Sequence, residues 1–198
     1  MNSTQNLKYD HTFVRRLGQV AEKCSSKLYQ DEDIPIEDLE IISVIMEEFV
    51  DRFHHGKEEQ SYFPQTNEKN GFSEDIRKFL IEHELGRRIA SMFRKELKEM
   101  KNNMEKISNK EKSISNFNQV KEPVARFLKA YSVFIADHTR KEDKFFDLIE
   151  NKHSISQEED KKIRKHYENC KDQIGGGIRI QKMIDLLEFL ENREWIKT

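Results

Sequence analysis

Residues that break or cross-link a chain are scarce in this sequence. Its 198 residues include only 7 glycines, 3 prolines and 2 cysteines. So little glycine and proline disfavours the turn-rich all-β folds and favours long helices. Cys24 and Cys170 lie far apart and form no CxxC pair, which argues against both a disulfide framework and a thiolate zinc site.

A large net charge and long apolar runs are also missing. The 35 lysines and arginines nearly balance the 37 acidic residues, so bulk electrostatics give no reason to expect nucleic acid or an anionic membrane as a partner. With 36% charged residues, no window approaches the roughly 20 apolar residues of a membrane span. Residues 1–12 lack the apolar core of a signal peptide. Together with the scarcity of cysteine, these features predict a cytoplasmic location.

What the sequence does contain is apolar residues at helical spacing. Aromatic residues make up 10% of the chain, with 13 phenylalanines among them, and they provide surface to bury. Apolar steps of three, four and seven predict four long helices, over about residues 7–29, 36–63, 73–100 and 122–150. We expect the second helix to stop at Pro64, which cannot continue it. Residues 102–118, rich in Asn, Lys and Ser, are interpreted as a loop.

A fifth helical region follows the fourth long helix. Ser156 and Glu159 have the spacing of a capping box, and the pattern is broken by three glycines at 175–177 before it resumes over 178–195. We therefore predict an all-α fold: an up-down four-helix bundle over residues 1–152, with a helical C-terminal extension over 153–198 packed on it. An apolar stripe in the extension could instead form a dimer interface, so the chain is expected to be a monomer or a homodimer.

Two of the predicted helices carry the same short pattern. His55 and Glu59 in the second helix, like His138 and Glu142 in the fourth, fit His-x-x-x-Glu-x-x-aromatic-Phe. The spacing places an imidazole and a carboxylate one turn apart on one helix face. In the fourth helix that face is the apolar stripe, so the pair should point into the bundle. Buried groups of this kind are costly unless they are paired or bind a metal.

The other two helices each add a histidine on an apolar face, His11 and His83. Four imidazoles and two carboxylates are too many ligands for one zinc ion, which takes four. A mixed nitrogen and oxygen set of this size suits two first-row metals bridged by carboxylates, and iron is the preferred choice over other first-row metals. His166 and Cys170, four residues apart, could form a second metal or redox site, but an ordinary surface pair is the simpler interpretation.

At these residues the sequence resembles the hemerythrin-like, or HHE cation-binding, family. The resemblance covers roughly residues 7–150. Its strongest parts are Phe49 followed by His54-His55-x-Lys57-Glu58-Glu59, and His138-x-x-Lys141-Glu142-Asp143. Weaker parts are Asp10-His11 and Glu82-His83-Glu84-x-Gly86-Arg87. Each piece alone is common on helices, whereas their joint order and spacing are specific.

The resemblance implies a metal-binding role for each of these residues. His11 and His55 would bind one iron, and His83 and His138 the other. Glu59 and Glu142 would bridge the two ions, with an oxo or hydroxo bridge beside them. Of the neighbours His54 and His55, we expect His55 to be the ligand. It has Glu59 four residues on, in the register of the fourth helix, whereas His54 and Glu58 should turn toward a different face.

One position departs from the family pattern. Oxygen-carrying hemerythrins have a further histidine one turn after the one that His83 resembles, and here that position is Arg87. Arginine is always protonated and cannot bind iron. We therefore expect an open position at the metals, with Arg87 near enough to hydrogen-bond a bound anion. Tyr131 shares the ligands' face and could hydrogen-bond a bridging oxygen or carry a radical, unless it is an ordinary core tyrosine.

The leading hypothesis for function is a non-haem di-iron protein that binds, senses or stores O2, NO or peroxide. A second hypothesis is an enzyme at the same site, either a di-iron oxidoreductase or an iron–sulfur repair factor. A third is a metal-free helical interaction module. The sequence leaves open whether the protein is an enzyme.

Overall fold

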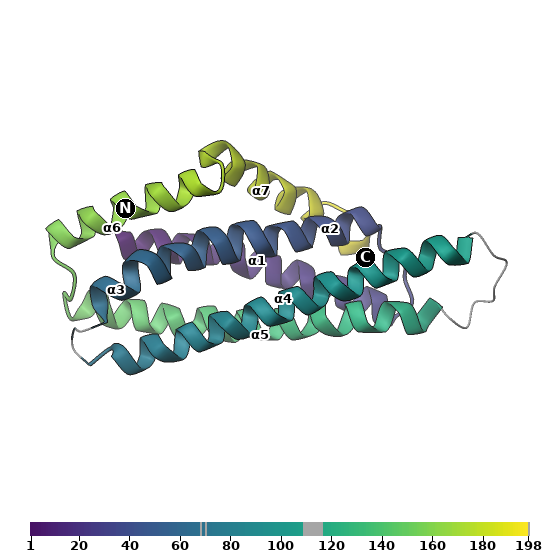
Figure 1. Cartoon of the computed structure of the whole chain (residues 1–198), viewed down its shortest axis with the longest axis horizontal. Helices are drawn as coiled ribbons and strands as arrows, with labels where there is room; N and C mark the ends of the chain where they lie inside the picture. The colour runs from purple at the N-terminus through teal and green to yellow at the C-terminus, as the bar shows by residue number, and fades with distance from the viewer. Residues whose placement is uncertain (68, 70, 109–116, 198) are drawn as a thin grey trace.

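The computed structural model describes residues 1–67, 69, 71–108 and 117–197. Throughout this part of the chain the regular structure is helical (Figure 1). The elements, in chain order, are α1 Ser3–Tyr29, α2 Ile36–Ile45, the π-helices η1 Met46–His55 and η2 Glu58–Tyr62, α3 Phe63–Thr66, α4 Ser73–Ser108, α5 Phe117–Asn151, α6 Gln157–Gln173, α7 Gly176–Glu191 and α8 Glu194–Lys197.

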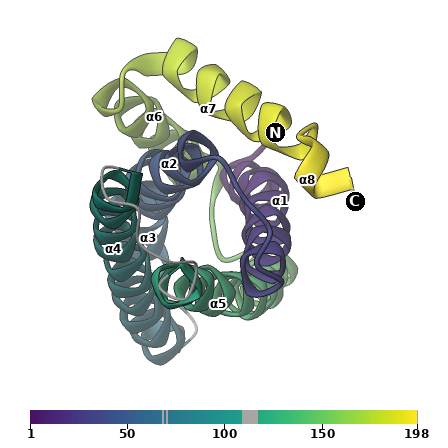
Figure 2. The same cartoon turned by 90° about the vertical axis from the view of Figure 1, so that its right-hand side faces the viewer.

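Four rods form the body of the molecule. They are α1, the continuous run α2–η1–η2–α3, α4 and α5, and seen end-on they surround a common centre (Figure 2). Successive rods run in opposite directions (Figure 1). The predicted all-α, up-down four-helix bundle is therefore confirmed. α1 begins with a capping box, in which Asn2 and Gln5 each satisfy the other's backbone N–H.

The helix ends differ from the prediction in the second rod and around the expected loop, and the last predicted helix is divided into α7 and α8. The second rod does not stop at Pro64 but continues to Thr66. Pro64 lies in the first turn of α3, where a proline's missing N–H costs little. The expected loop over residues 102–118 is also too long: α4 continues through residue 108 and α5 starts at residue 117. Residues 109–116 of that loop lie outside the described part of the chain.

The C-terminal helices lie along the outside of the bundle, against α1 and α2 (Figure 2). The predicted capping box of Ser156 and Glu159 opens α6. The predicted glycine break separates α6 from α7, and Gly175 takes a backbone φ of 104° that favours glycine. Arg179 holds Glu48 through two hydrogen bonds of 2.5 and 2.6 Å. The Trp195 indole donates to Asp38 at 2.8 Å.

The apolar core is divided in two along the bundle axis. One cluster includes Phe13, Phe53 and Ile135, and the other includes Leu7, Tyr62 and Phe145. In each rod the candidate ligands fall between residues of the two clusters, as His11 does between Leu7 and Phe13. The polar layer is therefore closed above and below by apolar side chains.

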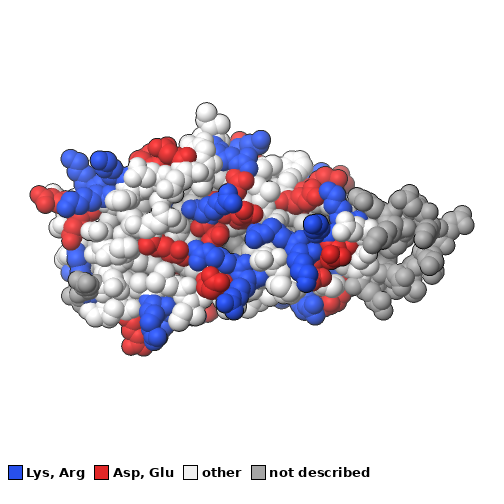
Figure 3. Space-filling view, in the orientation of Figure 1, with Lys and Arg blue, Asp and Glu red and all other residues white. Residues whose placement is uncertain are grey.

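Charged side chains of both signs lie on the surface. On the face shown in Figure 3, basic and acidic side chains are interspersed. Within the described residues, none of the helices has a stretch apolar and long enough for a membrane span.

Candidate metal centre

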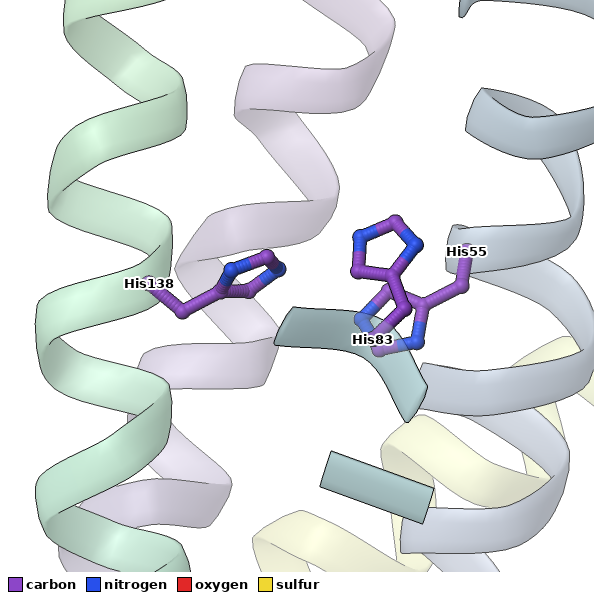
Figure 4. A group of neighbouring side chains, drawn as sticks. All are labelled: His55, His83 and His138. Atoms are coloured by element: carbon purple, nitrogen blue, oxygen red, sulfur yellow. The ribbon is translucent and has the colours of Figure 1, made fainter. Parts of the chain in front are cut away.

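Two groups of potential ligand atoms lie side by side in the middle of the bundle. In each group the ligand atoms lie within 4.8 Å of one another. The first group consists of His55, His83 and His138, which approach from three rods (Figure 4). The second group consists of His11, His54, Glu58 and Glu142. All seven side chains are buried.

Glu142 connects the two groups. Its Oε1 lies 3.2 Å from His83 Nε2. Its Oε2 lies 3.2 Å from His138 Nε2 and 3.3 Å from His11 Nε2. Neighbouring ligands that each sit about 2.1 Å from a metal ion are separated by roughly 3 Å. These spacings therefore match a carboxylate shared between two ions.

Glu58 makes the equivalent connection from the opposite side. Its Oε1 lies 3.5 Å from His54 Nε2, in the second group, and its Oε2 lies 3.4 Å from His83 Nε2, in the first. Two carboxylates thus each reach imidazoles of both groups. Either carboxylate could therefore contact a cation in each group.

The second rod departs here from the expectation based on an α-helix. We expected His54 and Glu58 to turn away from the site, yet both are fully buried in it. The rod is π-helical over Met46–His55 and Glu58–Tyr62. Its i→i+5 hydrogen bonds make each turn wider than an α-turn, so the rotation per residue is smaller. The adjacent His54 and His55 can therefore both face inward.

Glu59 takes a different place from the one expected for a bridging carboxylate. Its side chain is 25% exposed, and it lies outside both groups of ligand atoms. Its Oε1 accepts hydrogen bonds from His83 Nδ1 and from Arg87, each at 2.7 Å. Glu59 thus holds the outer nitrogen of the His83 ring, and it is Glu58, rather than Glu59 as expected, whose oxygens reach imidazoles of both groups.

Buried polar atoms without partners show that the centre suits cations. Among the described residues, both oxygens of Glu58 and one of Glu142 have no hydrogen-bond partner. The same holds for the Nε2 atoms of His11, His54 and His138. Leaving buried polar atoms unpaired costs about 1–3 kcal/mol each. Lone pairs of nitrogen and oxygen that converge in this way are what a first-row metal ion would satisfy.

Carboxylates outside the centre hold four of the imidazoles by their other nitrogen. His11 Nδ1 donates to Asp143 at 2.7 Å, and His138 Nδ1 donates to Glu82 at 2.8 Å. His54 Nδ1 lies 3.3 Å from Asp10, while His83 is held by Glu59 as described. Such contacts fix the ring and its tautomer, leaving Nε2 free for a metal.

These contacts close a ring around the bundle. Each acceptor comes from a residue adjacent to a candidate ligand on the neighbouring rod, as Asp10 is adjacent to His11 and Glu82 to His83. Asp10 on α1 holds the second rod, Glu59 on that rod holds α4, Glu82 on α4 holds α5, and Asp143 on α5 holds α1.

A cation accompanies each of the four acceptors. Arg15 contacts Asp143 at 2.6 Å, and Lys141 contacts Glu82 at 2.7 Å. Arg87 contacts Glu59, and the buried Lys57 contacts Asp10. The hydrogen bonds from the histidines and the contacts with these cations together outweigh burial and lower the pKa of all four acceptors, which favours their ionised forms.

His55 is the exception among the five imidazoles. Among the described residues, neither of its nitrogens has a hydrogen-bond partner, and the nearest carboxylate to its Nδ1 is Asp51 at 3.8 Å. Its ring stacks on that of His83, with 3.9 Å between centroids. Burial and then the neighbouring imidazoles, His83 first, hold the pKa of His55 well below its usual value. His55 is therefore neutral and offers lone-pair electrons.

The other ionisable side chains of the centre differ in the direction in which their pKa values are shifted. Burial lowers the pKa of His54 to about 4 despite the contact with Asp10. Burial opposes the charged forms of His11 and His83, but their carboxylate partners outweigh it and raise both pKa values. Burial and then Glu142 raise the pKa of Glu58 well above its usual value. Since a metal binds only the deprotonated ligands, its uptake would release protons.

A pocket of about 350 Å³ reaches the centre at His55. Arg87 and Tyr131 both line it. Arg87 donates to Asp51 at 2.6 Å as well as to Glu59, so its guanidinium is engaged by carboxylates. The Tyr131 hydroxyl is buried and has no hydrogen-bond partner among the described residues.

His166 and Cys170 do not form a joint site. His166 is exposed whereas Cys170 is buried, and neither belongs to a group of potential ligands within the part of the chain described.

Some site residues were missed by the reasoning from the sequence. They are His54, Glu58, Asp10, Glu82 and Asp143. A signal was present, because an acidic residue is adjacent to a buried ligand on every rod: Asp10-His11, Glu58-Glu59, Glu82-His83 and Glu142-Asp143.

A comparison with protein families gives a match over most of the chain. The model of the hemerythrin HHE cation-binding domain matches residues 2–149. No curated protein and no solved structure matches the chain.

Proposed function

Because the chain belongs to the hemerythrin HHE cation-binding domain family, we propose that it is a non-haem di-iron protein that binds O2, NO or peroxide. The observation that carries this proposal is the set of buried, unpartnered nitrogen and oxygen atoms shared by two adjacent groups. Two iron ions, joined by an oxo or hydroxo bridge, would supply redox chemistry and a position for the small ligand.

The residues of the chain divide the work of holding such a centre. One ion would be bound by His11 and His54, and the other by His83 and His138, with Glu58 and Glu142 bridging them. The carboxylates that contact the Nδ1 atoms orient all four of these imidazoles. The apolar clusters above and below separate the centre from the two ends of the bundle.

Metal analysis of the protein purified from iron-rich cells tests the proposal. We expect about two iron ions per chain and a near-ultraviolet absorption band that changes with dithionite and with air. Removing the metal should lower the melting temperature, because a ligand that binds only the folded state stabilises it. Protein that contains no metal and melts at an unchanged temperature after iron is added would contradict the proposal.

Turnover at the same centre is the second candidate function. The pocket that reaches His55 favours it, since a substrate needs access from solvent. Consumption of peroxide by the reduced protein, over many equivalents per chain, would establish an oxidoreductase. A single equivalent would establish binding or storage.

Because both cysteines are free thiols, we place this function in a reducing compartment, the cytoplasm.

A further inference from the structure

The fifth imidazole lies where the pocket meets the metal centre. His55 belongs to the group with His83 and His138, and it also lines the pocket. The mouth of the pocket is formed by exposed side chains such as Glu84 and Arg88, and its inner part by buried ones such as Val50. A molecule entering from solvent would therefore meet His55 before it meets the other imidazoles of that group.

His55 is also the imidazole that the structure holds least firmly. The other four each contact a carboxylate through Nδ1, at 2.7 to 3.3 Å. The Nδ1 atom of His55 lies 3.8 Å from Asp51 instead, and within the described part of the chain neither of its nitrogens has a hydrogen-bond partner. A ligand without such support is held more weakly, since loss of these supporting contacts typically costs 10- to 100-fold in metal affinity.

A second unpartnered group lies on the same pocket. Among the described residues that line the pocket, His55 and Tyr131 are the two whose buried side-chain nitrogen or oxygen atoms have no hydrogen-bond partner. Tyr131 is 2% exposed. Buried hydroxyls normally have partners, so the Tyr131 hydroxyl has a hydrogen bond left to donate.

The charges of the pocket are balanced. Its three arginines each contact a carboxylate of the same pocket: Arg87 contacts Asp51, Arg88 contacts Glu84 and Arg94 contacts Glu47. The pocket thus selects its occupant by size and by hydrogen bonding rather than by charge.

We propose that His55 is an exchangeable metal ligand at the inner end of this pocket. The molecule that replaces it would be a small one that accepts a hydrogen bond from the Tyr131 hydroxyl. This inference rests on the proposed di-metal function. The occupant has one lone pair for the metal and an acceptor atom for Tyr131. The four anchored imidazoles and the carboxylates of Glu58 and Glu142 would hold the metals, while the small ligand would take the position of His55.

Azide is a suitable probe, because it is small, binds metals and accepts hydrogen bonds. Metal content and the affinity for azide, followed by visible absorption, would be measured on the purified full chain. His55→Ala should keep most of its metal and bind azide at least tenfold more tightly. Tyr131→Phe should keep its metal and bind azide about five- to tenfold more weakly, as expected for one lost hydrogen bond.

The matched control is His54→Ala, which removes the adjacent but anchored imidazole and should lose much of the metal. His55→Gln and circular-dichroism melts of every variant identify a folding defect. If His55→Ala and His55→Gln lose metal as His54→Ala does while remaining folded, His55 is a fixed ligand and the inference is wrong. Unchanged azide affinity in Tyr131→Phe would also overturn it. A wild-type protein without metal would instead contradict the proposed function itself.

Discussion

Two adjacent glutamates in the second rod have opposite environments. Glu58 is fully buried and its carboxylate has no hydrogen-bond partner among the residues described, whereas Glu59 is partly exposed and accepts hydrogen bonds from His83 and Arg87. Burial and then Glu142 raise the pKa of Glu58. Burial also opposes the ionised form of Glu59, but its donors, His83 first, outweigh that and lower its pKa. In the metal-free protein, Glu58 therefore lowers the stability of the fold, whereas Glu59 raises it.

The pH dependence of the metal-free protein follows from these directions. A carboxyl with a raised folded pKa contributes stability below its unfolded pKa of 4.5, and that contribution is lost as the pH rises through the folded pKa. Glu58→Gln should therefore raise the melting temperature of metal-free protein at pH 7.5, by a few degrees for each 1 kcal/mol or so regained. At pH 5 the gain should be smaller. The same variant should lose metal.

Glu59→Gln is the matched control, with the opposite sign. A lowered folded pKa contributes stability above the unfolded pKa, and that contribution is lost as the pH falls through the folded value. This variant should lower the melting temperature at pH 7.5 and retain more metal than Glu58→Gln. Equal loss of metal in both variants, or a stabilised Glu59→Gln, would contradict the assignment of Glu58 as the bridging residue.

What the sequence could predict at this scale depended on helix geometry. Periodicity places His11, His83 and His138 on apolar faces of α-helices, and the structure brings these three into the centre. The choice between His54 and His55 assumed an α-helical rotation per residue. The rod is π-helical there, and nothing in the apolar spacing distinguishes a wider turn. The structure therefore brings both histidines in and places Glu58 where Glu59 was expected.

At the scale of the elements, α4 and α5 approach closely where a side chain is missing. A Cβ atom on Gly86 would lie 2.7 Å from the Phe134 ring. That ring stacks on His138, with 5.3 Å between centroids and 13° between planes. Gly86 thus lets Phe134 fill the space beside a candidate ligand.

Gly86→Ala should destabilise the protein by displacing Phe134. Overpacking of this kind typically costs 1–3 kcal/mol, and each 1 kcal/mol lowers the melting temperature of a chain of this length by about 2–4 °C. Gly177→Ala is the control, because a Cβ there meets nothing within 4 Å and the residue lies in the first turn of α7. It should leave the melting temperature unchanged or raise it slightly. Similar losses in both variants would show that close packing at Gly86 is unimportant.

The sequence predicted those helix ends whose signals lie in a few neighbouring residues. The capping box of Ser156 and the glycine break after α6 depend on neighbouring residues, and both are confirmed. The polar segment after residue 102 was expected to leave the helix, yet α4 continues to Ser108. Composition signals a solvent-exposed segment, and an exposed segment can still continue a helix whose preceding turns are anchored by packing.

At the scale of the whole molecule, α6, α7 and α8 extend beyond the residues that match the family. They cover α1 and α2 with buried apolar side chains, among them Met183, Leu187 and Leu190. We propose that residues 1–152 form the metal-binding bundle and that 153–198 form an extension that stabilises it. Truncation after Lys152 should retain the metal ligands but expose the apolar faces of α1 and α2.

Two measurements test that division. The truncated chain should bind metal, melt well below the full chain and bind a hydrophobic dye. In the full chain, Leu187→Ala should cost about 2–5 kcal/mol, whereas Ile178→Ala, at a site 88% exposed, should have little effect. A truncated chain that is folded yet cannot bind metal would show that the extension is part of the centre.

The ring of contacts between the four rods also governs how the bundle is aligned lengthwise. Each rod both gives and receives one of the four hydrogen bonds between histidine and carboxylate. If one rod slid by a single helical turn, about 5.4 Å, it would break the bond it gives and the bond it receives together. The lengthwise positions of the rods relative to one another are thus fixed before any metal ion binds. The side chains that would bind a cation are therefore already in position, so a cation could bind or leave without a rearrangement of the four rods.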